Sequence, residues 1–211
     1  MASDLPPRGG MYRPFLFLMT CGLAALPAAA QPWHEARPTG FFGVGFSQPL
    51  NPIATRLDTG WNFTGGVGAT NEYVGLLLDF TYNDFGINRT NLNRVGVREG
   101  SQRYWAVTLD PKVHVNQRGP VDFYVTGGGG LYSQITQFQS DFRDGNFGNG
   151  FGRNELISRN TIYKGGVDGG AGFAFNIGYS RAKIFAEARF HHMFTHGSGA
   201  NFVPVTVGIS W

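Results

Sequence analysis

The last nine residues of the chain, Val203–Trp211 (VPVTVGISW), alternate apolar with small or polar side chains. A period of two is typical of a β-strand with one apolar face and one polar face. The stretch therefore predicts a strand that ends the chain. Its apolar members are Val203, Val205, Val207, Ile209 and Trp211, and Thr206, Gly208 and Ser210 lie between them.

The same alternation recurs along the chain and predicts eight strands, at 40–48, 60–69, 73–85, 102–115, 121–137, 161–177, 182–194 and 202–211. The connections between them alternate in length. Three are short, around 70–72, 116–120 and 178–181, and four are longer, at 49–59, 86–101, 138–160 and 195–201. Short turns at one end and long loops at the other are typical of outer-membrane barrels.

The composition agrees with many short strands and excludes several other classes. The chain has 32 Gly in 211 residues, 15% aromatic residues and only 15% charged residues, against about 25% charged in soluble domains. So much glycine disfavours long helices. The net charge of +3 without a run of Lys or Arg argues against nucleic-acid binding.

The first thirty residues have the pattern of an export signal. Arg8 and Arg13 precede an apolar run at 15–26, and the small residues Ala28 and Ala30 suit a cleavage site. We expect a cleaved signal peptide at 1–30, exported by a Sec-type route, then a flexible lead at 31–39 and a barrel at 40–211. Met1 and Met11 both remain candidate starts. Cys21, the only cysteine, would be removed with the signal.

Two readings of the alternation differ in where the apolar face points. In a membrane barrel it faces lipid, with aromatic residues near the strand ends; in a soluble lipocalin-like barrel it lines the interior. The polar faces here carry Gly, Thr and Asn and few Lys or Glu, which favours the membrane. The aromatic residues near the strand ends are Trp61, Tyr82, Trp105, Phe123, Phe175, Phe194 and Trp211.

The C-terminal pattern resembles the signal that the bacterial barrel assembly machinery reads, although most such chains end in Phe where this one ends in Trp211. With the signal peptide and eight strands, the chain resembles the small outer-membrane barrels of the OmpA/OmpX type, the outer membrane protein beta-barrel domain family. The resemblance implies an all-β, eight-stranded antiparallel up-and-down transmembrane barrel. It implies location in a Gram-negative outer membrane, and contact of 203–211 with the assembly machinery. Because the chain stops at the eighth strand, we expect no peptidoglycan-binding domain.

Six charged residues fall on the predicted inward face, namely Asp79, Asp110, Lys112, Asp168, Glu187 and Arg189. Buried charges must pair, so we expect Arg189 and Lys112 to contact Asp110, Asp79 or Glu187. Eight strands enclose a bore that side chains fill. The cluster is therefore read as a structural plug, with a gated ion path as the alternative.

Four arginines, Arg89, Arg94, Arg98 and Arg103, lie in the long connection near 86–103, where only Glu99 opposes them. Arginine binds phosphate through paired hydrogen bonds. We hypothesise that they contact lipopolysaccharide, against the alternative of a solvated loop. The Gly/Asn-rich loop at 138–160 is long enough to bind a ligand of unknown kind.

Three further patterns carry weaker hypotheses. His191, His192 and His196 do not share a face, so no metal site is predicted. His196 and Ser198 superficially resemble the His-x-Ser pair of outer-membrane lipid A deacylases, but no Glu follows to orient the histidine. The glycine clusters at 65–66, 127–130, 165–166 and 169–170 lack a phosphate-loop context and are read as small residues in strands.

The sequence thus predicts a non-enzymatic outer-membrane barrel without cofactor or metal. Its role would be structural or in surface interaction, and its partners outer-membrane lipid and lipopolysaccharide. The alternatives are a narrow porin-like channel and, further off, a lipid A-modifying enzyme.

Overall fold

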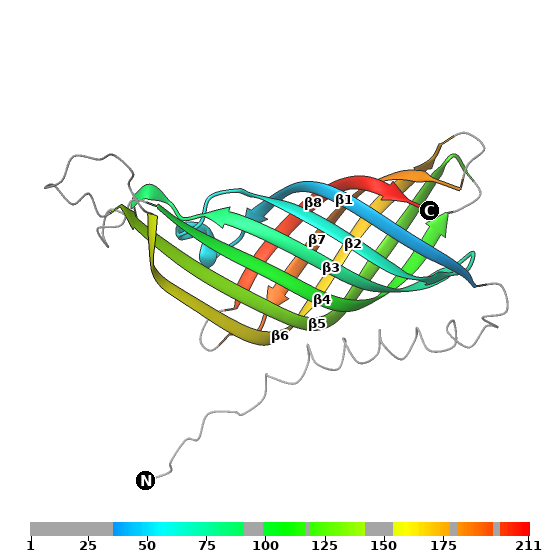
Figure 1. Cartoon of the computed structure of the whole chain (residues 1–211). Helices are drawn as coiled ribbons and strands as arrows, with labels where there is room; N and C mark the ends of the chain where they lie inside the picture. The colour runs from blue at the N-terminus through cyan, green and yellow to red at the C-terminus, as the bar shows by residue number, and fades with distance from the viewer. Residues whose placement is uncertain (1–35, 91–98, 117–118, 142–153, 178–180, 196–198) are drawn as a thin grey trace, which may run out of the picture. The chain divides into compact units, whose positions relative to one another are not determined.

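The computed structural model describes residues 36–90, 99–116, 119–141, 154–177, 181–195 and 199–211. The predicted signal peptide at 1–30 lies outside these residues. Within Ala36–Trp211, eight strands form a closed barrel in which each strand pairs antiparallel with its sequence neighbour (Figure 1). They are β1 (Arg37–Pro49), β2 (Gly60–Thr70), β3 (Val74–Gly86), β4 (Glu99–Asn116), β5 (Val121–Asp141), β6 (Asn154–Asn176), β7 (Lys183–Met193) and β8 (Ala200–Ser210).

The barrel closes between its first and last strands. β1 pairs with β8 from Phe41 opposite Ser210 to Pro49 opposite Phe202. Gly40 and Trp211 extend this ladder by exchanging two backbone hydrogen bonds, of 3.1 and 3.0 Å. Closure leaves no sheet edge in this part of the wall, because every strand has two neighbours.

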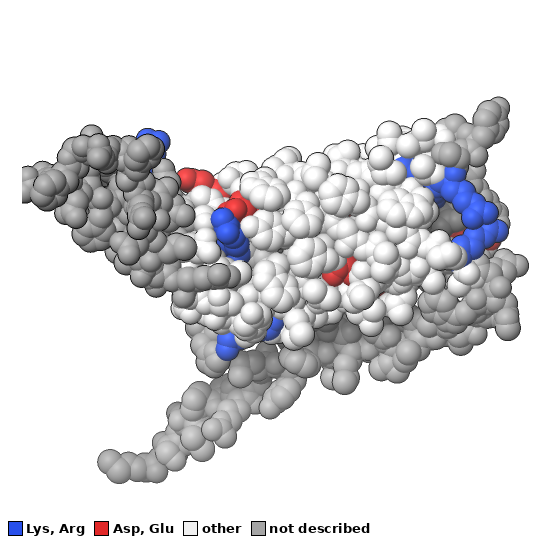
Figure 2. All heavy atoms as spheres, in the orientation of Figure 1, with Lys and Arg blue, Asp and Glu red and all other residues white. Residues whose placement is uncertain are grey.

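The alternation in the sequence becomes two different faces of the wall. Inward side chains such as Leu77, Asp79 and Thr81 on β3 are buried, whereas Leu76, Leu78 and Phe80 between them are 38–51% exposed. Figure 2 shows an almost uncharged band around the middle of the visible face, with charged side chains gathered toward its two ends. No helix in the described ranges is long and apolar enough to cross a membrane.

The connections alternate in length as the sequence predicts up to the β6–β7 connection (177–182), but the β7–β8 connection (194–199) is no longer than that one. At the short-turn end, Asn71 closes the β2–β3 turn, because its side-chain oxygen accepts hydrogen bonds from the backbone N–H groups of Tyr73 and Val74, both 2.8 Å. At the long-loop end, the connection after β1 contains the short 3-10 helix η2 (Ile53–Thr55). It then places Leu57 in the barrel mouth, bridged to Ile87.

Several predicted boundaries are corrected. Arg37–Thr39, expected in the flexible lead, already pair with Gly68–Thr70, because β2 extends far enough to offer them backbone partners. Proline is tolerated in this first part of β1, since β8 pairs only from Phe41 onward. The loops expected at 86–101 and 138–160 are shorter than predicted, because β4 begins at Glu99, β5 reaches Asp141 and β6 begins at Asn154.

Candidate functional site

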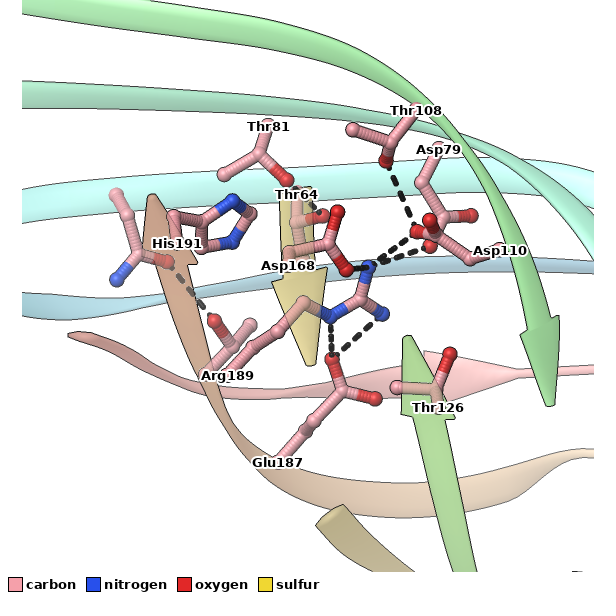
Figure 3. Close-up of polar contacts among 12 residues, drawn as sticks. Thr64, Asp79, Thr81, Thr108, Asp110, Thr126, Asp168, Glu187, Arg189 and His191 are labelled. Atoms are coloured by element: carbon pink, nitrogen blue, oxygen red, sulfur yellow. Dashed lines mark hydrogen bonds and ion pairs between the residues drawn. The ribbon is translucent and has the colours of Figure 1, made fainter. Parts of the chain in front are cut away.

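The interior of the barrel holds a charged cluster built around Arg189 of β7 (Figure 3). Its Nη1 lies 2.9 Å from Asp79 Oδ2 of β3 and 2.6 Å from Asp110 Oδ2 of β4. Its Nε and Nη2 reach Glu187 Oε1 at 2.9 and 2.8 Å. Asp168 Oδ1 of β6 is 3.6 Å from Nη1. One guanidinium thus joins four carboxylates from four strands.

Burial makes these contacts decisive for folding. The side chain of Arg189 is 4% exposed, and those of Asp79 and Asp110 are fully buried. A buried charge costs several kcal/mol unless it is paired. Arginine suits this place because its planar fork donates in several directions at once. Thr108 adds a hydrogen bond of 2.9 Å to Asp110 Oδ2.

The sequence predicts that Lys112 pairs within the cluster, but in the structure it does not. Its ammonium lies 3.9 Å from the centre of the Tyr124 ring and 5.7 Å from that of Phe41. No ion pair of Lys112 occurs among the described residues. The ammonium group of Lys112 therefore lies against aromatic faces, which attract cations. Of the two cations, only Arg189 pairs with the carboxylates of the cluster.

Two apolar layers enclose the charged cluster. On the long-loop side lies a buried group that consists of Leu57, Phe85, Tyr104, Ala106, Tyr132, Met193, Ala200 and Phe202. On the short-turn side lies a second buried group, which consists of Phe41, Leu77, Tyr124, Ala174 and Phe185. The charged cluster thus lies between two buried apolar groups.

His191 and Tyr132 connect the cluster to the first of these layers. The Tyr132 hydroxyl lies 2.9 Å from His191 Nδ1 and donates to Asp168 Oδ2 at 3.4 Å. The imidazole ring stacks on Phe202, with ring centres 5.1 Å apart. His191 is therefore an interior histidine, as its place on the inward face predicts.

The inward glycines make room for these large interior groups. A Cβ at Gly66 would lie 2.2 Å from Asp79 Oδ1, and one at Gly128 would lie 2.3 Å from Asp110 Oδ1. A Cβ at Gly166 would likewise clash with the Tyr132 ring, and one at Gly172 would clash with the Tyr124 ring. The clusters are strand residues, as the sequence predicts, and their inward members Gly66, Gly128 and Gly166 admit bulky neighbours.

A second polar group at the short-turn mouth is one that sequence reasoning missed. Asp122 of β5 accepts a hydrogen bond of 2.9 Å from Lys183 Nζ of β7, and its carboxylate lies 3.0–3.1 Å from His114 Nδ1 of β4. Thr70 Oγ1 of β2 is 3.3 Å from His114 Nε2. The alternation places His114 and Asp122 on the inward face, but only the stagger of β5, β6 and β7 in the sheet brings Lys183 to them.

The four loop arginines have different positions. Arg89 is exposed just after β3. Arg94 and Arg98 lie outside the described residues. Arg103 lies in β4 and not in the loop, and its Nε is 3.2 Å from Asp84 Oδ2 on β3. It shares the outward face with Trp105, and this position and pairing correct the prediction of a free loop arginine.

The histidines near the end of β7 do not lie together. His192 lies on the opposite face from His191, 2.5 Å by Nδ1 from Asn201 Oδ1. His196 and Ser198 lie outside the described residues. Within the part of the chain that is described, no group of three or more His, Cys, Asp or Glu is arranged to hold a metal ion.

Comparison with known proteins identifies the architecture. The model of the outer membrane protein beta-barrel domain family matches residues 15–211. The chain belongs to this family. The sequence-based predictions of fold class, family and location in the bacterial outer membrane are confirmed, and the apolar outward face is the face that meets lipid.

Solved structures of other outer-membrane proteins are similar to this chain at low sequence identity. A major outer membrane protein from Thermus thermophilus is 10% identical, with a TM-score of 0.56, over 84% of this chain and 99% of that one. Neisserial surface protein A (NspA) is 8% identical, with a TM-score of 0.52, over 83% and 97%. The attachment invasion locus protein Ail of Yersinia pestis is 16% identical, with a TM-score of 0.48, over 83% and 99%. No curated protein matches the chain significantly in sequence.

Proposed function

We propose that this family member is a non-enzymatic surface barrel. Its interior is closed to ions, and its long-loop end faces the outside of the cell for structural or interaction purposes. The observation that carries the proposal is the layered interior, in which the Arg189 cluster lies between two buried apolar groups. Water or ions crossing the bore would have to pass Phe85, Tyr104 and Phe202, whose rings contact one another with centres 5.3–5.8 Å apart.

Single-channel recording tests closure directly. The purified barrel, inserted in a planar lipid bilayer, should show no stable conductance above the bilayer baseline. Phe85→Ala combined with Phe202→Ala should raise the frequency of openings, because it removes two rings from the long-loop layer. Stable conductance of the unaltered protein would favour the narrow-channel alternative and overturn the proposal.

Lipopolysaccharide is the partner that we propose for the arginines. Exposed Arg89, with Arg94 and Arg98 of the same connection, would contact lipid phosphates, while Arg103 is engaged with Asp84 on the lipid-facing wall. Arg89→Glu, Arg94→Glu and Arg98→Glu together should reduce the lipopolysaccharide that copurifies with the barrel. Arg103→Glu should reduce it less. Equal copurification by the triple variant and the parent would reject this contact.

We also propose that β8 with Trp211 is the segment that the barrel assembly machinery reads. Its apolar residues alternate toward lipid up to the final indole, which is 60% exposed. The segment therefore offers an apolar face and a terminal aromatic ring for recognition before the barrel closes.

A further inference from the structure

The charges inside the bore do not balance. Among the described residues, four carboxyl groups surround the guanidinium of Arg189, and they belong to Asp79, Asp110, Asp168 and Glu187. Lys112 brings one further positive charge, although its ammonium lies against aromatic rings. Four ionised carboxylates would therefore face only two cations in an interior shielded from water. Such an excess of charge is strongly unfavourable, and buried acids respond to it by keeping a proton.

The neighbouring groups do not supply the missing positive charge. β2 and β8 contain no ionisable side chain, and in β1 the only one is Arg37, at the short-turn end. Lys183 and His114 pair with Asp122 at the short-turn mouth. The other titratable groups beside the cluster are Tyr124, Tyr132 and His191. Tyrosine never carries a positive charge, and the guanidinium of Arg189 repels a second cation on the His191 ring.

Asp79 and Asp110 depend on a single positive partner. Their Oδ2 atoms accept hydrogen bonds from the same nitrogen, Nη1 of Arg189, at 2.9 and 2.6 Å. Their Oδ1 atoms are buried and accept no hydrogen bond from the described residues. The wall beside each Oδ1 is a glycine, Gly66 or Gly128, where even a Cβ would overlap the oxygen. No side chain of the wall can therefore bring a donor to these two oxygens.

The two carboxyl groups also meet each other. Figure 3 shows them side by side next to the Arg189 guanidinium, and Asp79 lies within hydrogen-bonding distance of Asp110. A hydrogen bond between two carboxyl groups requires a proton on one of them, because an ionised carboxylate only accepts. Two carboxyl groups that share a site resist ionising together, and they titrate as a pair. The contact between Asp79 and Asp110 therefore marks the place where a proton is held.

We propose that Asp79 and Asp110 form a proton-binding site, which holds one proton between them at neutral pH and makes the stability of the barrel depend on pH. The ligand is the proton itself. The site goes beyond the proposed surface role and is independent of it, because it lies between the two buried apolar groups and not in the loops.

The bound proton fixes the direction of the pH dependence. In the unfolded chain, aspartates release their protons above about pH 5, whereas the folded pair keeps one. The folded state then binds more protons than the unfolded state, so stability falls as the pH rises. The fall ends at the pH where the folded pair releases its proton as well.

Urea unfolding of the barrel in lipid vesicles measures this linkage. Asp79→Asn and Asp110→Asn each replace one member of the pair by a neutral group of the same size. Between about pH 5.5 and about pH 7.5, the folding equilibrium constant of the parent should fall by about a further tenfold per pH unit relative to either variant, the effect of one proton. Asp84→Asn is the matched control on the outward wall and should keep the slope of the parent. Equal slopes for the parent and both pair variants overturn the proposal.

Infrared spectroscopy of the folded parent tests the site without any reference to stability. At neutral pH the parent should show the carbonyl band of a protonated carboxyl group. The band should appear in the difference spectra of parent minus Asp79→Asn and parent minus Asp110→Asn, and not in that of parent minus Asp84→Asn. A parent without the band overturns the proposal. So does a stability that follows the Na⁺ concentration instead of the pH, because a metal cation would then balance the charge. Failure here with no conductance in bilayer recordings would reject the proton site alone and leave the closed surface barrel intact.

Discussion

Arg189 is the central residue of the charged cluster inside the barrel. It lies within ion-pair distance of carboxylates from β3, β4, β6 and its own strand, and its side chain is 4% exposed. Removing one member of a buried ionic group leaves the others uncompensated, which costs more than the group contributes when intact. The loss of stability depends on burial, so breaking a partly exposed ion pair at the mouth of the barrel should cost much less.

Arg189→Met should therefore lower the free energy of unfolding by about 3–5 kcal/mol, measured by urea titration in lipid vesicles. Lys183→Met is the matched control, because this lysine pairs with Asp122 at the mouth while 30% exposed, and it should cost about 1 kcal/mol or less. Adding Asp79→Asn and Asp110→Asn to Arg189→Met should restore part of the loss. Equal effects of the two Met variants would contradict the central place of Arg189.

Glycines of β6 differ by the face on which they lie. A Cβ at Gly172 would be 2.6 Å from Tyr124 Cζ and 2.7 Å from the Ala186 carbonyl oxygen, whereas the nearest atom to a Cβ at Gly169 is 3.9 Å away. Gly172→Ala should destabilise the barrel by about 1–3 kcal/mol through overpacking. Gly169→Ala should change stability by about 0.5 kcal/mol or less. Urea midpoints of the two variants check this, and a larger loss at Gly169 would count against the described packing.

At the scale of elements, the first and last strands depend on each other. Trp211 exchanges backbone hydrogen bonds with Gly40, and its indole covers that glycine so closely that a Cβ there would lie 2.9 Å from a ring carbon. Thr39 Oγ1 also donates to the Trp211 carbonyl at 2.8 Å. The C-terminal residue thus has a place in the closed barrel as well as the proposed place in assembly.

Deleting Trp211 should separate these two roles. In cells, the amount of barrel in the outer membrane should fall severalfold, because the assembly signal loses its final aromatic ring. In detergent, the purified variant should still fold, because β1 and β8 keep their ladder from Phe41 to Pro49. Trp211→Phe should behave as the parent in both settings. Normal membrane levels of the deletion variant would argue against recognition through this residue.

The β5–β6 hairpin is the element in which sequence reasoning was least accurate. The Gly/Asn-rich stretch predicted a loop from 138 to 160, yet strands occupy its two ends up to Asp141 and from Asn154. Alternation is weak there because the stretch is rich in Gly, Asn and Asp, so the periodic signal is lost although the backbone pairing continues.

For the whole molecule, closure of the sheet is the feature with the clearest consequence. Every strand of the membrane part has two partners, so opening the barrel breaks a complete ladder at once. The folded barrel should therefore resist SDS at room temperature and migrate differently in gels before and after heating. Protein taken from the outer-membrane fraction should show this shift. A soluble protein in the periplasmic fraction without a shift would contradict the membrane barrel.

The period of two, the eight strands, the lengths of most turns and the face on which each charge lies can all be predicted from the sequence, because these features depend only on neighbours along the chain. The alternation alone therefore places Asp79, Asp110, Asp168, Glu187 and Arg189 on the inward face. Which of them meet depends on the folded barrel, and so do the contact of Lys112 with Tyr124, the pairing of Arg103 with Asp84 and the longer pairing of β6 with β5 than with β7. The stagger between paired strands and the closure of β1 on β8 set those distances, and neither leaves a mark in the sequence of a single strand.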